Sequence, residues 1–168
     1  MNREQLNTDI EIYHKMIYRL AYSCTGNHFD AEDITQDTFI RLYRYRKDFS
    51  SDEHKKAFLI RVTVNLCKDM QKSAWFRKRT ELNDQIHANE NPGEKLIEKE
   101  NEKTLQEYIL ALKPKYRAVI FLHYFEDYST AEIAKTLNIP ESTVTTRLSR
   151  ARGHLKTEIT NMKEIYCI

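Results

Sequence analysis

Residues 129–155, STAEIAKTLNIPESTVTTRLSRARGHL, have the pattern of two short helices joined by a tight turn. Ser129 is a good N-cap, and Glu132 three residues later completes a capping box. Asn138 can adopt the left-handed conformation that ends a helix, and Pro140 suits the first turn of the next helix. The stretch therefore predicts a helix-turn-helix.

The second of these helices has one apolar side and one polar side. Val144, Leu148, Ala151 and Leu155 recur at helical spacing and predict the buried side. The free side carries Ser142, Thr145, Thr146, Ser149 and Arg152, flanked by Thr143, Arg147 and Arg150. Such a helix can enter a DNA major groove. An ordinary helical hairpin with a solvated charged face remains the alternative on this pattern alone.

The composition favours helices throughout. Only three Gly and three Pro occur in 168 residues, which disfavours turn-rich β folds, and charged residues make up 31% of the chain. A hydrophobic content of 40% is enough for small packed cores. We expect an all-α fold of two small helical domains joined by a flexible linker. The net charge of +2 says little, because acidic and basic residues lie in separate blocks.

The cysteines and the N-terminal sequence bear on the compartment. Cys24, Cys67 and Cys167 are widely spaced, without a CxxC pair, and fit reduced thiols in a cytosolic protein better than disulfides or a zinc site. We expect Cys24 and Cys67 to fill core space. Because there is neither a hydrophobic signal region nor an apolar run of transmembrane length, a soluble, cytoplasmic protein without direct membrane insertion is expected.

Apolar spacing also predicts the domain boundaries. Helices are expected over residues 9–24, 30–45 and 52–73 in the first half. In the second half, a helix over residues 116–125 precedes the helix-turn-helix. The expected organisation is a first domain over residues 1–79, an acidic linker over 80–103, a second domain over 104–160 and a tail over 161–168.

Acidic residues open the second expected helix. Asp30, Glu32, Asp33 and Asp37 stand there with Gln36 among them. Carboxylates near a helix N-terminus are favoured by the helix dipole, which explains part of this pattern. The remainder is an acidic surface suited to a basic partner. A carboxylate-based metal or acid/base site is the alternative, but no His or second acid pair completes it.

The third expected helix carries a polar stripe. Arg61, Asn65, Lys68 and Lys72 lie at i, i+4, i+7 and i+11, so they share one face. Asn is a poor helix former, and Asn65 beside basic residues indicates a use for this face. A solvated face without a partner remains the alternative.

Aromatic residues among cations follow in the segment KSAWFRKR at residues 72–79. Cations can follow phosphates while rings accept unstacked bases, as single-stranded nucleic acid requires. The region is locally basic, with twelve Lys or Arg between Arg41 and Arg79 against four acids. Trp75 or Phe76 packing into the core is the open alternative.

Together these motifs resemble bacterial extracytoplasmic-function sigma factors, the compact group of the sigma-70 family that keeps only regions 2 and 4. Residues 30–39, DAEDITQDTF, resemble region 2.2, and residues 57–69 resemble the helix of regions 2.3 and 2.4. Residues 112–117 and 128–155 resemble region 4. The resemblance covers nearly the whole chain in the order of the family.

The resemblance implies three sets of site residues. The set expected to dock on the clamp of the largest RNA polymerase subunit is Asp30, Glu32, Asp33, Gln36, Asp37 and Arg41. The set expected at the minus-ten element, where a base flips out as the strands separate, is Arg61, Asn65, Lys68, Asp69, Lys72, Trp75 and Arg77. The set expected on the minus-thirty-five duplex is Ser142, Thr143, Thr145, Thr146, Arg147 and Arg150.

The sequence departs from the family pattern at several positions, among them Lys72, Met70, Gln71, Asn138 and Ser142. Lys72 stands where members often carry Arg, which implies weaker contact with phosphate. Glu141, at the start of the recognition helix, would either repel phosphate or accept a hydrogen bond from a cytosine amino group.

The function implied is that of a promoter-specificity subunit that binds core RNA polymerase and promoter DNA, both duplex and single-stranded. It would be no enzyme and need no cofactor or metal. The family implies an anti-sigma factor, membrane-held in many cases, and a stress or envelope response. The alternative is a stand-alone helix-turn-helix regulator, which would need a dimerisation surface and a palindromic site. The sequence gives neither the promoter sequence nor the inducing signal.

Overall fold

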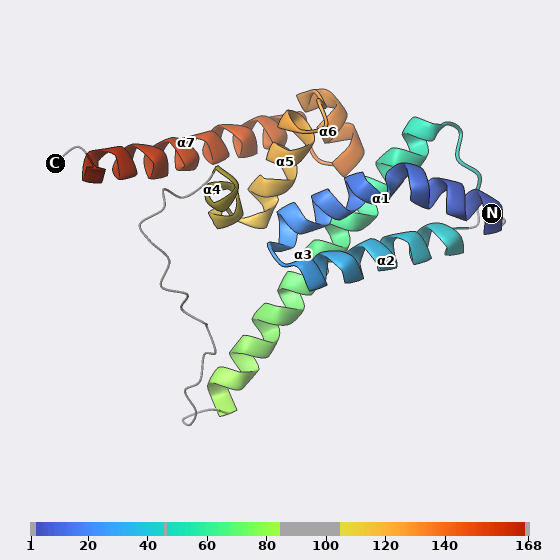
Figure 1. Cartoon of the computed structure of the whole chain (residues 1–168), viewed down its shortest axis with the longest axis horizontal. Coiled ribbons are helices and arrows are strands. Elements are labelled where there is room, and N and C mark those ends of the chain that lie inside the picture. The colour runs from blue at the N-terminus through green and yellow to red at the C-terminus, as the bar shows by residue number, and fades with distance from the viewer. Residues whose placement is uncertain (1–2, 46, 85–104, 167–168) are drawn as a thin grey trace.

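The computed structural model describes residues 3–45, 47–84 and 105–166, and these residues form seven helices and no strand (Figure 1). The first half contains α1 (Arg3–Thr25), α2 (His28–Arg44) and α3 (Asp52–Asp84). The second half contains α4 (Leu105–Ala111), α5 (Pro114–Tyr124), α6 (Thr130–Leu137) and α7 (Glu141–Tyr166). The prediction of an all-α fold is confirmed.

A short turn joins α1 to α2. Helix α2 begins at His28, two residues before the start that was predicted at Asp30. Gly26 has a φ of 74°, a conformation that a glycine adopts without strain. Asn27 is the N-cap, and its side-chain oxygen accepts a hydrogen bond from the backbone N–H of Asp30 at 3.1 Å. The cap, not the first acidic residue, therefore sets the start of α2.

The helix-turn-helix forms as α6 and α7, with the predicted caps. The Ser129 side chain accepts from the backbone N–H of Glu132, and the Glu132 carboxylate accepts from the Ser129 N–H at 2.8 Å. Asn138 has a φ of 52°, in the left-handed region. Pro140 lies just before α7 and its carbonyl accepts from Val144 N, so it caps the helix and does not occupy its first turn.

The third helix is longer than its apolar pattern predicts. It was expected to end near Ser73, but α3 continues to Asp84. Residues 74–84 contain neither Gly nor Pro and are mostly good helix formers, so nothing local stops the helix. The helix enters the segment expected as a linker, and residues 85–103 of that segment lie outside the described residues.

The first half has a core of its own between α1, α2 and α3. Ile17, Leu42 and Leu59 are fully buried there, with Tyr13 and Phe39 at the edge. Burial of this apolar surface is the main stabilising contribution, at roughly 25 cal/mol per Å². The three helices therefore form one bundle (Figure 1).

A second core joins the two halves of the chain. Leu20 of α1 and Ile60 of α3 belong to the same buried cluster as Val119 of α5, Ile133 of α6 and Leu148 of α7. Figure 1 shows α5 lying beside α1, with α6 next to the upper part of α3. The two expected domains are thus packed against each other through a shared apolar interface.

Within the described ranges, no helix has the length and apolar character needed to cross a membrane.

Candidate nucleic-acid interface and docking surface

The predicted minus-thirty-five residues lie together on α7. Val144, Leu148 and Ala151 are buried and fix the orientation of the helix. On the other side Ser142, Thr145, Thr146 and Arg150 are exposed, while Thr143 and Arg147 are half-buried. The amphipathic spacing thus placed all six residues on the surface.

Two threonine hydroxyls of this face donate to their own helix. Thr145 Oγ1 donates to the Glu141 carbonyl at 3.1 Å, and Thr146 Oγ1 donates to the Ser142 carbonyl at 2.7 Å. Because their protons are engaged, both oxygens present lone pairs outward. They suit donors on a base edge, such as an amino group, better than acceptors.

Helix α5 adds two residues to this face that the sequence analysis did not assign to it. Lys115 and Tyr116 border a shallow depression of about 280 Å³, which Ser142, Thr146 and Arg150 also line. The Lys115 ammonium lies 5.2 Å from the centre of the Tyr116 ring. The signal available in the sequence was Lys115 directly after Pro114, because proline favours the start of a helix. Lys115 is exposed there, whereas Tyr116 is buried.

Glu141 has a structural role that its sequence position does not reveal. Its Oε1 accepts a hydrogen bond of 2.6 Å from Thr130 Oγ1, at the start of α6. The carboxylate is therefore tied to the neighbouring helix. This bond engages one of its oxygens, and the carboxylate keeps the capacity to accept a further donor.

The predicted minus-ten residues do not all share one environment. Asn65, Lys68, Asp69 and Lys72 are exposed on α3, and Lys72 pairs with Asp69 at 3.8 Å. Arg61 is half-buried, and its Nε donates to the Thr136 carbonyl of α6 at 3.1 Å. The predicted roles of Trp75 and Arg77 fall on side chains outside the described residues.

Further contacts hold the helix-turn-helix half against α3. Lys56 Nζ lies 3.6 Å from Glu126 Oε2 and 5.1 Å from the centre of the Tyr128 ring. Burial raises the pKa of Tyr128 above its ordinary value. Polar contacts of Lys56 therefore join the first turns of α3 to the segment before α6.

The predicted docking residues lie on α2. Glu32, Asp33, Gln36, Asp37 and Arg41 are exposed, and Asp30 is half-buried. Three of them, Glu32, Asp33 and Gln36, border a groove of about 930 Å³ between α1 and α2. Glu32 and Asp33 therefore belong to the polar rim of this groove.

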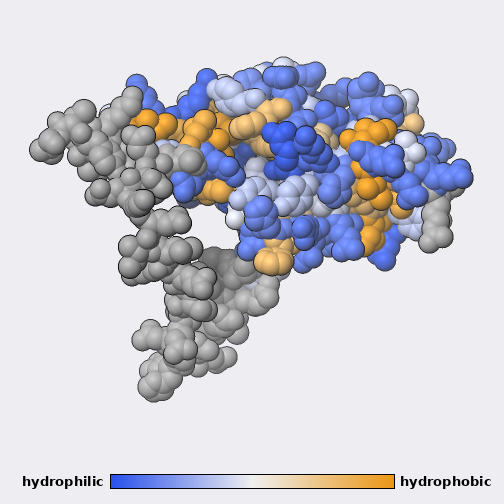
Figure 2. Space-filling model, viewed as in Figure 1, coloured by the Kyte–Doolittle hydropathy of each residue, from blue (hydrophilic) through white to orange (hydrophobic). Residues whose placement is uncertain are grey.

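The groove has an apolar floor that the sequence analysis missed. It is formed by Leu6, Ile10, Phe39, Ile40 and Tyr43. Ile40 is 39% exposed and Tyr43 is 54% exposed, which is unusual for such side chains in the absence of a partner. Figure 2 shows apolar residues gathered over α1 and α2 on a largely hydrophilic face. The i+4 spacing of Gln36, Ile40 and Arg44 was the available signal.

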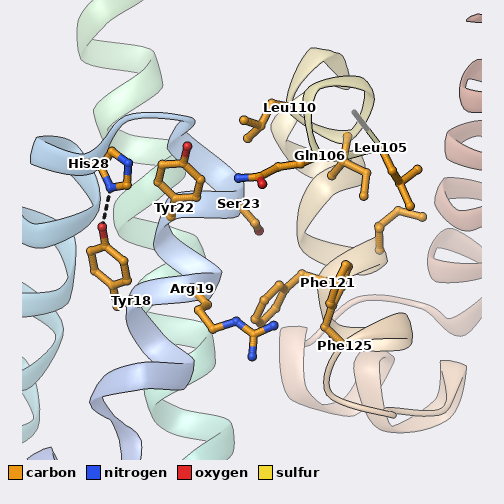
Figure 3. Close-up of a pocket in the computed structure, with 12 residues that line it drawn as sticks. Tyr18, Arg19, Tyr22, Ser23, His28, Leu105, Gln106, Leu110, Phe121 and Phe125 are labelled. Atoms are coloured by element: carbon orange, nitrogen blue, oxygen red, sulfur yellow. Dashed lines mark hydrogen bonds between the residues drawn. The ribbon is translucent and has the colours of Figure 1, made fainter. Parts of the chain in front are cut away.

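A second apolar cavity, of about 430 Å³, lies between α1 and the α4–α5 pair (Figure 3). Tyr22, Phe121 and Phe125 line it, and the Arg19 guanidinium lies 5.7 Å from the centre of the Phe121 ring. Tyr18 borders both this cavity and the α1–α2 groove, and its hydroxyl is 2.6 Å from His28 Nδ1. The two hollows are therefore neighbours along α1. No sequence motif predicted the cavity.

No cluster of three or more His, Cys, Asp or Glu side chains in the described part of the chain could hold a metal ion.

Comparison with known proteins identifies both halves of the chain. Residues 10–77 match the family described as sigma-70 region 2, and residues 102–155 match the family described as sigma-70, region 4. The chain is 32% identical over 168 residues to the ECF RNA polymerase sigma factor SigW of Bacillus subtilis, covering 91% of this chain and 88% of the relative. It is 34% identical to SigE of Mycolicibacterium smegmatis, covering 83% of this chain and 56% of that protein.

Two solved structures share the fold. The sigma factor RpoE, crystallised with the anti-sigma factor NepR from Bartonella quintana, has a TM-score of 0.60 at 20% identity, covering 94% of this chain and 98% of that one. CnrH, in complex with the cytosolic domain of CnrY, has a TM-score of 0.66 at 22% identity, covering 95% and 90%. With both regions matched in order and a relative matched over most of its length, the chain belongs to the extracytoplasmic-function sigma factors of the sigma-70 family.

Proposed function

We propose that this chain is a promoter-specificity subunit that docks on core RNA polymerase through α2 and reads the minus-ten and minus-thirty-five elements through α3 and α7. The polymerase supplies the chemistry, and this chain supplies the contacts that select the start site. The observation that carries the proposal is the presence of three separate surfaces on one small chain: one acidic and apolar, and two polar and basic.

The α1–α2 groove supports the docking step. An apolar floor with Ile40 and Tyr43, rimmed by Glu32 and Asp33, fits a helical partner with apolar ridges and basic flanks. Buried aromatic and aliphatic residues supply most of the affinity in such interfaces, while rim charges steer the encounter. DNA, as a polyanion, would be repelled here. The partner for this surface is therefore a protein.

The exposed part of α3 supports a role in strand opening. Asn65 can form hydrogen bonds with a base, and Lys68 and Lys72 can follow phosphates. A flipped base needs hydrogen bonds along its edge and a pocket wall, which a polar helix face with adjoining side chains supplies. Arg61 completes this face once its bond to Thr136 is broken.

The exposed face of α7 supports duplex recognition. Arg147 and Arg150 can donate to guanine O6 and N7, while Thr145 and Thr146 accept from amino groups. Lys115 of α5 lies where a helix in the major groove would bring it near the phosphate backbone. A small surface of this kind binds weakly alone, so tethering to the polymerase is what gives the pair of surfaces selectivity.

The packing of the two halves adds a condition to this function. With Arg61 bonded to α6 and Lys56 paired with Glu126, the minus-ten face is partly covered by the minus-thirty-five half. The two halves must separate before both surfaces can contact DNA. Polymerase binding would favour the separated arrangement if it contacts the halves at distant places.

An anti-sigma factor is the expected regulatory partner, and a stress or envelope response the expected setting. RpoE, which shares this fold, was solved in complex with the anti-sigma factor NepR, and CnrH, which also shares it, with the cytosolic domain of CnrY. The cavity of Figure 3 adjoins the docking groove at Tyr18, so a partner that occupied both would block the polymerase surface.

A gel-shift assay with a promoter from the same genome tests the proposal. The free chain should bind duplex promoter poorly, and the chain with core polymerase should form a tight, salt-sensitive complex. Tight specific binding by the free chain, on a palindromic site and as a dimer, would instead assign it to stand-alone regulators.

A further inference from the structure

The exposed surface of α7 has two sides that differ in hydrogen-bonding character. The side next to α5 carries donors, because three basic residues border the shallow depression there: Lys115, Arg147 and Arg150. Glu141, the first residue of α7, and Thr145 lie outside that depression and about one helical turn apart. Both are exposed. The start of α7 therefore has an acidic side as well as a basic one.

The Glu141 carboxylate is held in place by α6. Its Oε1 accepts a hydrogen bond of 2.6 Å from Thr130 Oγ1, and Thr130 is half-buried at the first position of α6. Among the described residues the carboxylate forms no other hydrogen bond and no ion pair, so its Oε2 keeps its lone pairs for a ligand. A side chain that is fixed before binding loses less conformational entropy when a partner arrives. Glu141 is therefore a preorganised acceptor.

Thr145 adds a second acceptor on the same side of the helix. Its hydroxyl donates to the Glu141 carbonyl at 3.1 Å, so its oxygen is left with lone pairs only. On α7, the nearest cation of this side by helical spacing is Arg152, which lies about three turns beyond Glu141 and donates from its Nε to the Leu148 carbonyl. The first turns of α7 therefore offer oxygen acceptors on this side, and their cations lie on the other.

An acceptor of this kind can distinguish the two strands of a base pair. In the major groove each base pair exposes one amino group, on cytosine N4 or adenine N6, whereas guanine O6 and thymine O4 are acceptors. A carboxylate attracts the amino group and is repelled by the carbonyl oxygens and by phosphates. Cytosine fits two neighbouring acceptors better than adenine, whose N7 is an acceptor beside the amino group. Residues at the start of a recognition helix are those that contact base edges.

We propose that Glu141 is a specificity-determining residue for the minus-thirty-five element, where its free carboxylate oxygen accepts a hydrogen bond from the amino group of one cytosine. Thr130 is its positioning residue, because it acts only through the carboxylate. The inference rests on the proposed function of α7 in duplex recognition, and it adds the base that one residue selects. Guanine or thymine at the same place on that strand is rejected, because an oxygen then faces the carboxylate.

The test uses the full chain bound to core polymerase and a promoter fragment in which each minus-thirty-five position is changed to all four bases. At one position the wild type should prefer cytosine on one strand, and exchanging the two bases of that pair should weaken binding about tenfold or more. In Glu141→Ala the preference at this position should disappear, while the preferences at the other positions remain. The ratio of affinities is the readout, because loss of a negative charge also strengthens binding to every duplex.

A base analogue isolates the amino group itself. The cytosine is replaced by 2-pyrimidinone, which lacks the amino group and keeps the ring. This change should weaken binding of the wild type about tenfold more than binding of Glu141→Ala. Weaker base pairing with guanine affects both chains alike and cancels in the comparison. An equal loss of affinity in both chains would overturn the proposal.

Variants of Thr130 test its positioning role. Thr130→Val keeps the shape of the side chain but cannot donate, and should reduce the cytosine preference a fewfold at the same position alone. Thr130→Ser keeps the hydroxyl and should bind like the wild type. Glu158→Ala removes an exposed negative charge further along α7 and should keep every base preference. If Thr130→Val instead lowers the affinity for all fragments alike, the role of Thr130 is structural and its assignment is overturned.

The outcomes separate this inference from the proposed function. A Glu141→Ala holoenzyme that binds all fragments more tightly but keeps every base preference would overturn the inference and leave Glu141 as a charge that repels phosphate. Loss of an adenine preference in place of a cytosine preference would overturn the choice of base. A wild-type holoenzyme that binds no promoter fragment would contradict the proposed function, and this inference with it.

Discussion

Arg61 of α3 donates a hydrogen bond from its Nε to the backbone carbonyl of Thr136 in α6, with 3.1 Å between the two atoms. The donor belongs to the predicted minus-ten face and the acceptor to the helix-turn-helix. One contact thus engages a candidate DNA-reading side chain of one half with the backbone of the other half. Under the proposed function, the closed arrangement and open-promoter binding compete for Arg61.

The ion pair beside this contact allows the closed arrangement to be weakened without altering the DNA-facing residues. Glu126→Lys places a second cation against Lys56, whose Nζ is 3.6 Å from Glu126 Oε2. We expect the halves to separate more readily, by about 1 kcal/mol or a fewfold in the equilibrium, since the pair is only partly buried. Amide exchange in α6 should rise.

The charge-swapped double variant Lys56→Glu with Glu126→Lys is the matched control. It restores an attractive pair and should return amide exchange in α6 toward the level of the wild type. If amide exchange in α6 is the same in Glu126→Lys and in the double variant, the ion pair does not contribute to holding the halves together.

The acidic rim of the α1–α2 groove should matter for polymerase binding and not for folding. Asp33 is exposed, and Asp33→Ala should weaken binding to core polymerase about tenfold, which corresponds to about 1.4 kcal/mol. Thermal unfolding should be unchanged. Binding can be followed by fluorescence anisotropy of the labelled chain.

Glu158→Ala serves as the control for charge alone, because Glu158 is exposed on α7 away from the groove residues. It should bind core polymerase like the wild type. If Asp33→Ala and Glu158→Ala weaken binding to core polymerase equally, the effect comes from net charge, and this result would contradict a docking role for the α2 face.

Arg150 should contribute to minus-thirty-five recognition. It is exposed on α7 beside Ser142 and Thr146, and a side chain that reads a base edge contributes about 1–3 kcal/mol. Arg150→Ala should therefore weaken the holoenzyme on its promoter about tenfold or more. Binding to core polymerase should stay as it is. Lys156→Ala, exposed on α7 and outside the residues expected to contact DNA, is the control expected to keep promoter affinity.

The salt dependence of these complexes distinguishes the kind of contact. If Arg150 binds a phosphate and not a base, its loss should weaken all duplexes alike and reduce the slope of log affinity against log salt by about one. If Arg150→Ala leaves the affinity for promoter and for random DNA unaltered, Arg150 is not part of the DNA interface.

The pair of Lys55 and Asp9 gives a pH dependence of stability. Lys55 Nζ lies 2.8 Å from Asp9 Oδ1, and this hydrogen bond raises the pKa of Lys55 above 10.5. A group whose pKa is raised by folding stabilises the fold below its unfolded pKa, and this contribution is lost as the pH rises through the folded pKa. Lys55→Met should lower the free energy of unfolding by roughly 2 kcal/mol at pH 7, because it leaves the buried Asp9 carboxylate unpaired.

Urea unfolding at pH 7 and at a pH above the raised pKa of Lys55 measures this effect. The difference in the free energy of unfolding between wild type and Lys55→Met should narrow at the higher pH, because Lys55 of the wild type is then uncharged. The double variant Asp9→Asn with Lys55→Met should recover part of the loss. A difference that stays constant with pH would assign the effect to the packing of the Lys55 chain.

Local features were the ones that could be predicted from the sequence. The capping box of Ser129 and Glu132, the left-handed Asn138 and the polar face of α7 all depend on residues within a few positions of each other. The spacing of Asn65, Lys68 and Lys72 likewise predicted an exposed face on α3. Helical periodicity determines such faces directly.

Features that depend on packing could not be predicted in this way. Arg61 and Thr136 are 75 residues apart, so no periodic pattern relates them. The apolar floor at Ile40 and Tyr43 was hidden because exposed and buried apolar residues look alike in a sequence. The approach of Arg117 to Gly26 likewise depends on how α5 docks on α1.

Run-off transcription tests the central claim most directly. The purified chain is added to bacterial core polymerase with a library of promoter fragments from its own genome, and the transcripts are sequenced. We predict that transcripts start from a small set of fragments that share two spaced elements, and that Asp33→Ala and Arg150→Ala both lower their yield. Polymerase that initiates no differently with the chain than without it would contradict the account.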